Sequence, residues 1–148
     1  MTSSRSNHFL RGGVTLLELL IALALVSVLV AMAAPRVRRL VDAIGARGAA
    51  GDAAALFGSA RQLAIVRWVR TTVLVDTVAG VVSLVAGPDT LIRRDVHREH
   101  GATLHASRTS ATYTPLGLAL GVSNLTLIAV RGAAAETVTV SRLGRVRW

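Results

Sequence analysis

The sequence predicts an α+β fold in which a long N-terminal helix packs on an antiparallel β-sheet or β-sandwich. One reason is that residues 14–68 hold a long apolar run followed by an apolar stripe at helical spacing. Another is that residues 69–148 contain β-branched segments separated by glycine-containing turns. A helical block followed by a block of strands is typical of the α+β class.

The segment from Val14 to Ala34 has the composition of a membrane-spanning helix. Its polar side chains are Thr15, Glu18 and Ser27. A helix needs about 20 apolar residues to cross a bilayer, so this segment is long enough. Residues 1–13 hold arginine but no acidic residue, and the positive-inside bias therefore predicts a cytoplasmic N-terminus. The rest of the chain is expected outside the cytoplasm.

Glu18 is unusual because an ionisable side chain in a membrane helix costs about 2.5–3.5 kcal/mol for Asp, Lys or Arg at the helix centre. The cost is smaller near the helix start, where the carboxylate can reach the interface. The helix dipole also favours a negative charge in the first turn. Glu18 is thus a candidate functional residue that needs a partner.

The string Gly13-Val14-Thr15-Leu16-Leu17-Glu18, followed by Leu19-Leu20-Ile21-Ala22 and Pro35, resembles the processing site of type IV pilins and type II secretion pseudopilins. The resemblance implies that a prepilin peptidase cleaves between Gly13 and Val14 and that Val14 is then N-methylated. It also implies that Glu18 pairs with the N-terminal amine of a neighbouring subunit during filament assembly. Val14 stands where the family usually has phenylalanine.

This resemblance implies a division of the chain into four segments. They are a leader peptide (1–13), a transmembrane and filament-core helix (14–34), its amphipathic continuation (35–68) and a periplasmic β-rich domain (69–148). The protein would be a single-pass inner-membrane protein before it enters a pilus or pseudopilus. Two other interpretations are a plain signal anchor and a secretory signal cleaved at Ala31-Met32-Ala33. Neither accounts for glycine, threonine and glutamate at this spacing.

Pro35 is expected to kink the helix, because proline removes a backbone donor and clashes with the preceding turn. Apolar residues then continue along one helical face, namely Val37, Leu40, Val41 and Ile44. The glycine-rich residues 45–51 weaken the helix by about 1 kcal/mol per glycine, which predicts a bend or a melted turn. The helical face resumes at Ala53 and continues to about Trp68.

Six later segments have the pattern of strands: Thr71–Asp76, Val81–Ala86, Leu91–His97, Ala102–Ala106, Leu125–Arg131 and Thr137–Arg142. The third and fourth carry the weaker pattern. Hairpin turns are predicted around Ala79-Gly80 and around residues 132–136, with an exit turn at Gly87-Pro88-Asp89.

Two C-terminal motifs resemble the GspH/FimT branch of pseudopilins. Tyr113-Thr114-Pro115-Leu116-Gly117 matches its Phe-x-Pro-x-Gly step, with tyrosine in place of phenylalanine, and residues 144–147 match its Gly-Arg-x-Arg tail. Some members of the FimT branch bind DNA through this tail during natural transformation. The resemblance therefore makes Arg145 and Arg147 candidate DNA-binding residues.

The chemistry of the tail agrees with that role. In an extended tail Arg145 and Arg147 point to one side, about 6.8 Å apart, and each guanidinium can bind a phosphate through two hydrogen bonds. Arg142 and Arg131 could add to the patch, and Trp148 could stack on a base. The alternative is a solvated terminal strand whose arginines cover a sheet edge.

Composition limits the other functions open to the chain. The net charge is +9, all 17 basic residues are arginines and there is no cysteine. A basic surface favours polyanions, whereas the missing cysteine and lysine exclude disulfides, thiol nucleophiles and Schiff bases. No enzymatic site and no cofactor are predicted.

One group of residues has metal-ligand types: His97, Glu99, His100 and His105. In a strand-and-loop region His97 and His100 need not face the same way, and two further ligands at zinc spacing are hard to assemble. We therefore predict solvated loop histidines and no metal site.

The sequence thus predicts a non-enzymatic minor pilin or pseudopilin, a structural subunit of a type II secretion pseudopilus or a type IV pilus. The alternative is a FimT-like minor pilin that binds DNA in DNA uptake, and a third interpretation is a membrane-anchored domain unrelated to filaments. The expected partners are prepilin peptidase, other pilins, the inner membrane and, under the alternative, DNA.

Overall fold

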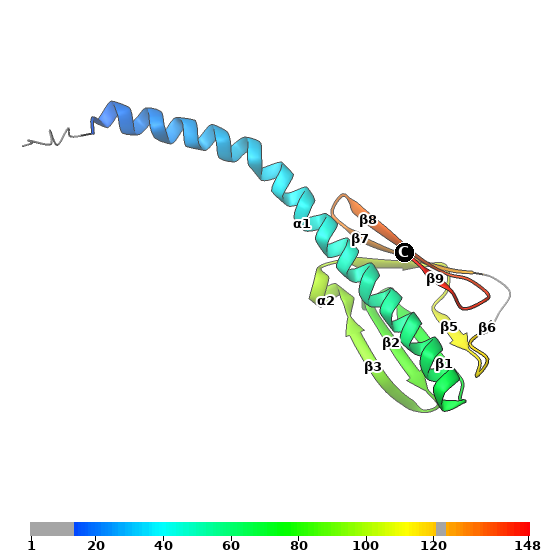
Figure 1. Cartoon of the computed structure of the whole chain (residues 1–148). Coiled ribbons are helices and arrows are strands. Elements are labelled where there is room, and N and C mark those ends of the chain that lie inside the picture. Colours follow the sequence, from blue (N-terminus) through cyan, green and yellow to red (C-terminus); the bar gives the residue numbers. More distant parts are fainter. Residues whose placement is uncertain (1–13, 121–123) are drawn as a thin grey trace, which may run out of the picture. The chain divides into compact units, whose positions relative to one another are not determined.

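One long helix, two antiparallel sheets and one short helix make up the computed structural model, which describes residues 14–120 and 124–148 (Figure 1). Helix α1 (Leu16–Arg67) precedes all the strands, so the predicted α+β class is confirmed. The chain forms two units that divide within α1, between Val37 and Arg38. The predicted leader, including Gly13, lies outside the described residues.

The first unit is the apolar part of α1. Every side chain from Val14 to Val37 is exposed. Among the described residues, α1 is the one helix that is long and apolar enough to cross a membrane. Thr15 caps its start, because Thr15 Oγ1 accepts a hydrogen bond from the Glu18 backbone N–H at 3.2 Å. Pro35 lies within the helix, and the kink there stays a prediction.

In the second unit α1 carries a buried stripe of mostly small residues: Gly45, Ala46, Ala49, Ala50, Ala53, Ala54, Leu56, Phe57, Ala60 and Ala64. The predicted melted turn at residues 45–51 is wrong, because the helix is continuous there, whereas the alternative of a bend stays a prediction. A Cβ on Gly45 would meet the Arg131 side chain, and one on Gly48 would lie 2.7 Å from the ring of His100. A larger residue at either position would collide with these side chains, so glycine is favoured there although its helix propensity is low.

The first sheet has the strand order β3-β2-β1-β5-β6. Its strands are β1 (Thr71–Asp76), β2 (Val81–Ala86), β3 (Asp89–Asp95), β5 (Ser110–Tyr113) and β6 (Ala119–Leu120). The β1–β2 hairpin has the predicted bounds. In its turn, Asp76 Oδ1 accepts hydrogen bonds from the N–H groups of Val78 and Ala79 at 3.0 and 2.8 Å, as turn-forming aspartates do.

The predicted strand Leu91–His97 is wrong at both ends. The strand β3 begins at Asp89 and stops at Asp95, where helix α2 (Val96–His100) begins. Asp95 caps this helix, since its Oδ1 accepts a hydrogen bond from the Arg98 backbone N–H at 2.9 Å. Gly101 ends it with a φ of +63°.

The second sheet has the order β4-β7-β8-β9. Its strands are β4 (Thr103–Ala106), β7 (Leu125–Arg131), β8 (Ala134–Val140) and β9 (Val146–Arg147). The strand β4 begins one residue after the predicted Ala102, and β7 has the predicted bounds. The strand β8 ends at Val140 rather than at the predicted Arg142, and it begins at Ala134 rather than at Thr137. The reason is a tight turn at Gly132-Ala133, with Gly132 at φ +52°, which leaves the following residues free to pair.

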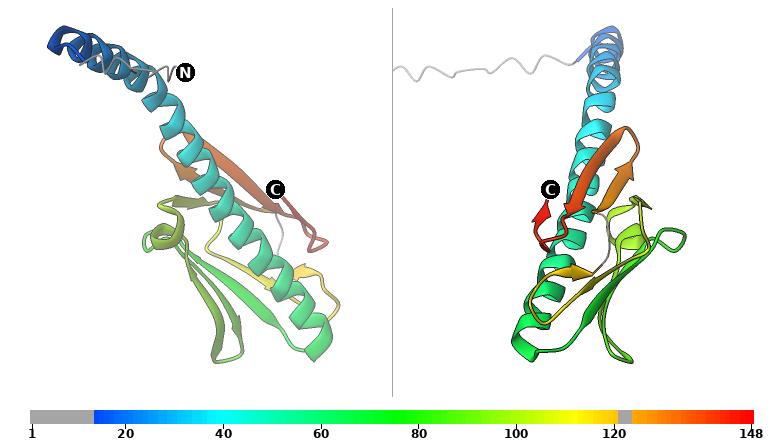
Figure 2. Two further views of the ribbon diagram at one scale, coloured as in Figure 1. Left: turned by 60° about the vertical axis from the view of Figure 1, so that its left-hand side comes forward. Right: turned by 90° about the vertical axis from the view of Figure 1, so that its right-hand side faces the viewer.

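The hydrophobic core lies between the second-unit part of α1 and the two sheets, which this part of the helix crosses in both views of Figure 2. The largest buried side chains in it are Tyr113, Phe57, Leu84, Leu104 and Leu127. Thr71 is the one polar residue that is fully buried among the described residues, and its Oγ1 donates to the Ala60 carbonyl at 2.8 Å. This bond fixes the start of β1 against α1.

Candidate assembly helix and arginine groove

The predicted processing and assembly residues lie at the start of α1. Val14 is 69% exposed, and Glu18 is an exposed acidic residue in the first turn of the helix. The Thr15 hydroxyl accepts its hydrogen bond from the backbone N–H of Glu18, so this cap does not occupy the Glu18 carboxylate. Both residues are thus accessible to other molecules, while their roles in cleavage, methylation and pairing remain predictions.

The two C-terminal motifs meet at one residue of α1. Arg61 Nε donates a hydrogen bond to the Gly117 carbonyl at 3.0 Å. Gly117 and Gly144 have φ values of +73° and +71°, a region that favours glycine. A Cβ on Gly144 would collide with the Gly117 carbonyl oxygen, and one on Gly117 would lie 2.7 Å from the end of Ile65. Close packing against α1 therefore requires glycine in both motifs.

Tyr113 lies beneath this junction. Its side chain is fully buried, and within residues 14–120 and 124–148 its hydroxyl has no hydrogen-bond partner. Burial raises the pKa of Tyr113 to about 12, although the nearby positive charge of Arg61 lowers it in part. The residue acts here as a core aromatic, which is consistent with phenylalanine at this place in the related motif.

An open groove of about 670 Å³ runs along this junction, between α1 and the C-terminal tail. Its lining is Gly58, Arg61, Gln62, Ile65, Gly144, Arg145, Val146 and Arg147. Three arginines therefore face one groove, two from the tail and one from the helix. Arg61 could not be foreseen, because nothing in the local sequence of a helix shows what a distant tail brings beside it.

The tail itself is only partly a strand. Arg147 lies on β9 and pairs with Thr139 of β8. Arg145 closes a turn in which its N–H donates to Ser141 Oγ at 3.2 Å, and its carbonyl accepts from the Ser141 N–H at 2.9 Å. The turn and the short strand hold both arginines at the groove.

The other residues considered for the tail patch lie elsewhere. Arg142 and Trp148 are exposed but do not line the groove, and the Trp148 ring lies beside Gly51 of α1. The Arg131 side chain is engaged away from the tail, where its Nε lies 3.7 Å from an Asp42 carboxylate oxygen.

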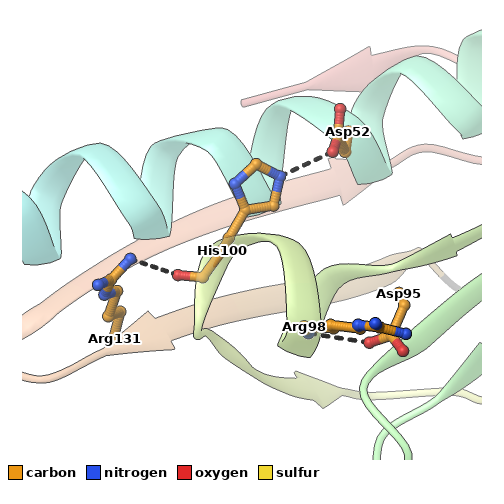
Figure 3. A network of polar contacts seen from close by, with 5 residues as sticks. All are labelled: Asp52, Asp95, Arg98, His100 and Arg131. Carbon is orange, nitrogen blue, oxygen red and sulfur yellow. Dashed lines mark hydrogen bonds and ion pairs between the residues drawn. The ribbon is translucent and has the colours of Figure 1, made fainter.

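The histidine group is arranged differently from the prediction. His97 and His100 lie on helix α2, and Figure 3 shows the His100 ring directed at Asp52 of α1. His100 Nε2 and Asp52 Oδ2 are 2.7 Å apart. The prediction of a solvated loop histidine is therefore wrong for His100, whose side chain is only 25% exposed. Asp52 was not predicted, because it is distant in sequence from the histidines.

Residues 10–34 match the prokaryotic N-terminal methylation motif. The type IV minor pilin FimU of Pseudomonas aeruginosa strain PAO1 has a similar fold in two crystal forms. One has a TM-score of 0.59 at 17% identity over 69% of this chain and 86% of FimU. The other has a TM-score of 0.57 at 17% identity over 68% and 90%. No curated protein matches the sequence.

The chain thus combines the prokaryotic N-terminal methylation motif at its start with a fold similar to that of a type IV minor pilin. The motif and the likeness to FimU are consistent with the GspH/FimT-type pilin-like fold.

Proposed function

We propose that the chain is a minor pilin or pseudopilin of a type IV pilus or a type II secretion pseudopilus. In this proposal a prepilin peptidase cleaves after Gly13, Val14 is N-methylated, and the first part of α1 enters the core of a filament. The coincidence of the methylation motif with the exposed apolar helix carries the proposal.

The first unit exposes a large apolar surface. Large apolar side chains there are more than half exposed, including Leu16 at 78% and Met32 at 68%. Exposure of apolar area to water costs about 25 cal/mol per Å², so this surface needs lipid or other helices around it. The inner membrane supplies lipid before assembly, and neighbouring subunits supply helices afterwards.

The position of Glu18 is compatible with both the membrane and the filament. It lies in the first turn, where the helix dipole favours its charge, and a helix packed among others needs a positive partner for it. The methylated amine of Val14 in an adjacent subunit would be that partner. The remainder of the chain would then lie on the periplasmic side.

Intact-mass spectrometry of the membrane-extracted protein tests this proposal, using cells with and without prepilin peptidase. We expect a peptidase-dependent product that begins at methylated Val14. An uncut chain in both strains would support a plain signal anchor, and a cut after Ala33 would support a secretory signal. Either result would exclude the filament role.

The arginine groove favours a second function, the binding of DNA in an uptake machine. Arg61, Arg145 and Arg147 line one groove, and three phosphate contacts would give a slope of about −2.7 for log K against log salt on duplex DNA. The groove also adds a helix residue to the two that the tail motif provides. Arg142 and Trp148, outside the groove, could contact flanking phosphates or bases.

The test compares charge-matched double variants of the full chain in detergent by DNA retention at several salt concentrations. Arg145→Ala with Arg147→Ala should weaken binding and flatten the salt slope by about 1.8. The control is Arg93→Ala with Arg94→Ala on the exposed strand β3, outside the groove. Equal loss in both double variants would indicate only attraction to the net charge and would reject a groove-specific site.

A further inference from the structure

A second polar cluster lies away from the groove, where α2 meets α1. It consists of Asp52 on α1 and Glu99 and His100 on α2, and one ligand atom from each lies within 4.8 Å of the others. Asp52 and His100 are 48 positions apart in the sequence. We propose that the three residues form a binding site for one zinc ion, independent of the filament and DNA roles.

The donor atoms are near the spacing that zinc requires. Tetrahedral zinc with Zn–N and Zn–O bonds of about 2.0–2.2 Å needs ligand atoms about 3.3–3.6 Å apart. The 2.7 Å contact between His100 Nε2 and Asp52 Oδ2 must widen slightly. The exposed side chain of Glu99 must rotate inward.

The main chain around His100 is held in place by three contacts. The His100 carbonyl accepts a hydrogen bond from Arg131 Nη1 at 2.5 Å, which ties α2 to β7. Asp95 caps the start of α2, and Gly101 ends it in a left-handed conformation. The two ligands on α2 therefore start from a defined backbone, which reduces the entropy lost on binding.

Gly48 gives the His100 ring its place beside α1. A Cβ at this position would lie 2.7 Å from Nδ1 and 2.8 Å from Cε1 of His100. Because glycine leaves this space open, the ring packs against the helix one turn before Asp52 and directs Nε2 at the carboxylate (Figure 3). Glycine is a poor helix former, but at position 48 it allows the proposed ligand His100 to lie against α1.

The donor set selects the class of metal. One imidazole with two carboxylates suits zinc, whereas calcium and magnesium take sites made of oxygen ligands. The two carboxylates also balance the charge of a divalent cation, in a chain whose net charge is +9. Three protein ligands leave one tetrahedral position for water or for a group from another molecule.

The test uses the full chain in detergent micelles, treated with EDTA, dialysed and titrated calorimetrically with zinc chloride. We expect one equivalent to bind with a micromolar Kd and the midpoint of thermal unfolding to rise. Affinity should also fall as the pH is lowered, because zinc competes with protons for the imidazole and the carboxylates.

Single-residue variants test which side chains bind the zinc ion. His100→Gln and Glu99→Gln should each weaken zinc binding by more than about tenfold, and Glu99→Gln leaves the His100–Asp52 contact in place. His105→Gln, an exposed histidine on β4 outside the cluster, is the matched control and should bind like the original chain. Cobalt(II) should give the visible absorption of a tetrahedral ion, which His100→Gln should lose.

Two results would overturn the proposal. One is the lack of saturable zinc binding up to about 1 mM, which would leave an ordinary ion pair between His100 and Asp52. The other is equal weakening in His105→Gln and His100→Gln, which would indicate adventitious binding by surface histidines.

Discussion

His100 Nε2 lies 2.7 Å from the Asp52 carboxylate, and this contact joins α2 to α1. Both side chains are partly exposed, so the pair is screened and contributes at most about 1 kcal/mol to stability. Its position depends on two glycines in the same helix, because Gly45 and Gly48 make room for Arg131 and for the His100 ring. Glycine lowers the helix propensity at these two positions, but it leaves the space that the packed side chains need.

The glycines of α1 should therefore respond in opposite ways to alanine. Gly48→Ala should destabilise the protein, since the added Cβ lies 2.7 Å from the His100 ring and displaces it from Asp52. Gly58→Ala should raise the free energy of unfolding by about 1 kcal/mol, because no atom lies within 4 Å of the added Cβ. Urea unfolding in detergent, followed by tryptophan fluorescence, measures both. Equal effects of the two variants would contradict the packing argument.

Replacement by alanine should destabilise the protein more at Gly144 than at another glycine with a similar backbone conformation. Gly144→Ala adds a collision with the Gly117 carbonyl to the strain of a positive φ, and should cost about 2–4 kcal/mol. Gly87→Ala is the control, since its φ is +61° and its added Cβ has open space. The control should cost only about 1 kcal/mol. Thermal unfolding midpoints compare the two variants.

Tyr113 should make stability depend on pH above about 10. An unfolded tyrosine ionises near pH 10, whereas burial raises the pKa of folded Tyr113 to about 12. The unfolded state thus loses its proton first. The corresponding stability is fully present below about pH 10 and falls by roughly 2–3 kcal/mol as the pH rises to about 12.

The chain allows this titration to be read directly, because Tyr113 is its one tyrosine and it has no lysine or cysteine. Absorbance at 295 nm should give the pKa of the folded protein. Tyr113→Phe should remove the loss of stability between these pH values and be nearly neutral at pH 7, since the hydroxyl lacks a partner among the described residues. A midpoint near 10 in the folded protein would refute the burial argument.

Glu18 should matter for assembly and not for folding. Glu18→Ala removes an exposed first-turn carboxylate, so filament incorporation should be lost while the amount of protein in the membrane stays unchanged. Glu136→Ala is the matched control, because Glu136 forms a surface ion pair with Arg47 at 3.5 Å and lies outside the apolar part of α1. Crosslinking of the variants to other pilins in cells measures incorporation. Normal crosslinking of Glu18→Ala would argue for an anchored domain outside filaments.

The fold was predictable in its regular parts. The apolar run, the helical stripe and the β-branched segments led to the long helix and to the correct bounds of β1, β2 and β7, because these elements follow from local periodicity. The short strands β5 and β6 were not predicted, and β9 was foreseen only as the alternative of a terminal strand at the tail. Helix α2, which Asp95 caps, begins where the sequence predicted the end of a strand.

The sequence by itself determined the α+β class, the exposed apolar helix and the motif at its start, because hydropathy and local spacing act along the chain. Only the tertiary structure decided that Arg61 joins Arg145 and Arg147 in one groove and that Asp52 meets Glu99 and His100. It also decided that residues 45–51 stay helical. These outcomes depend on which distant side chains pack against α1, and contacts of that kind leave no periodic signal in the local sequence.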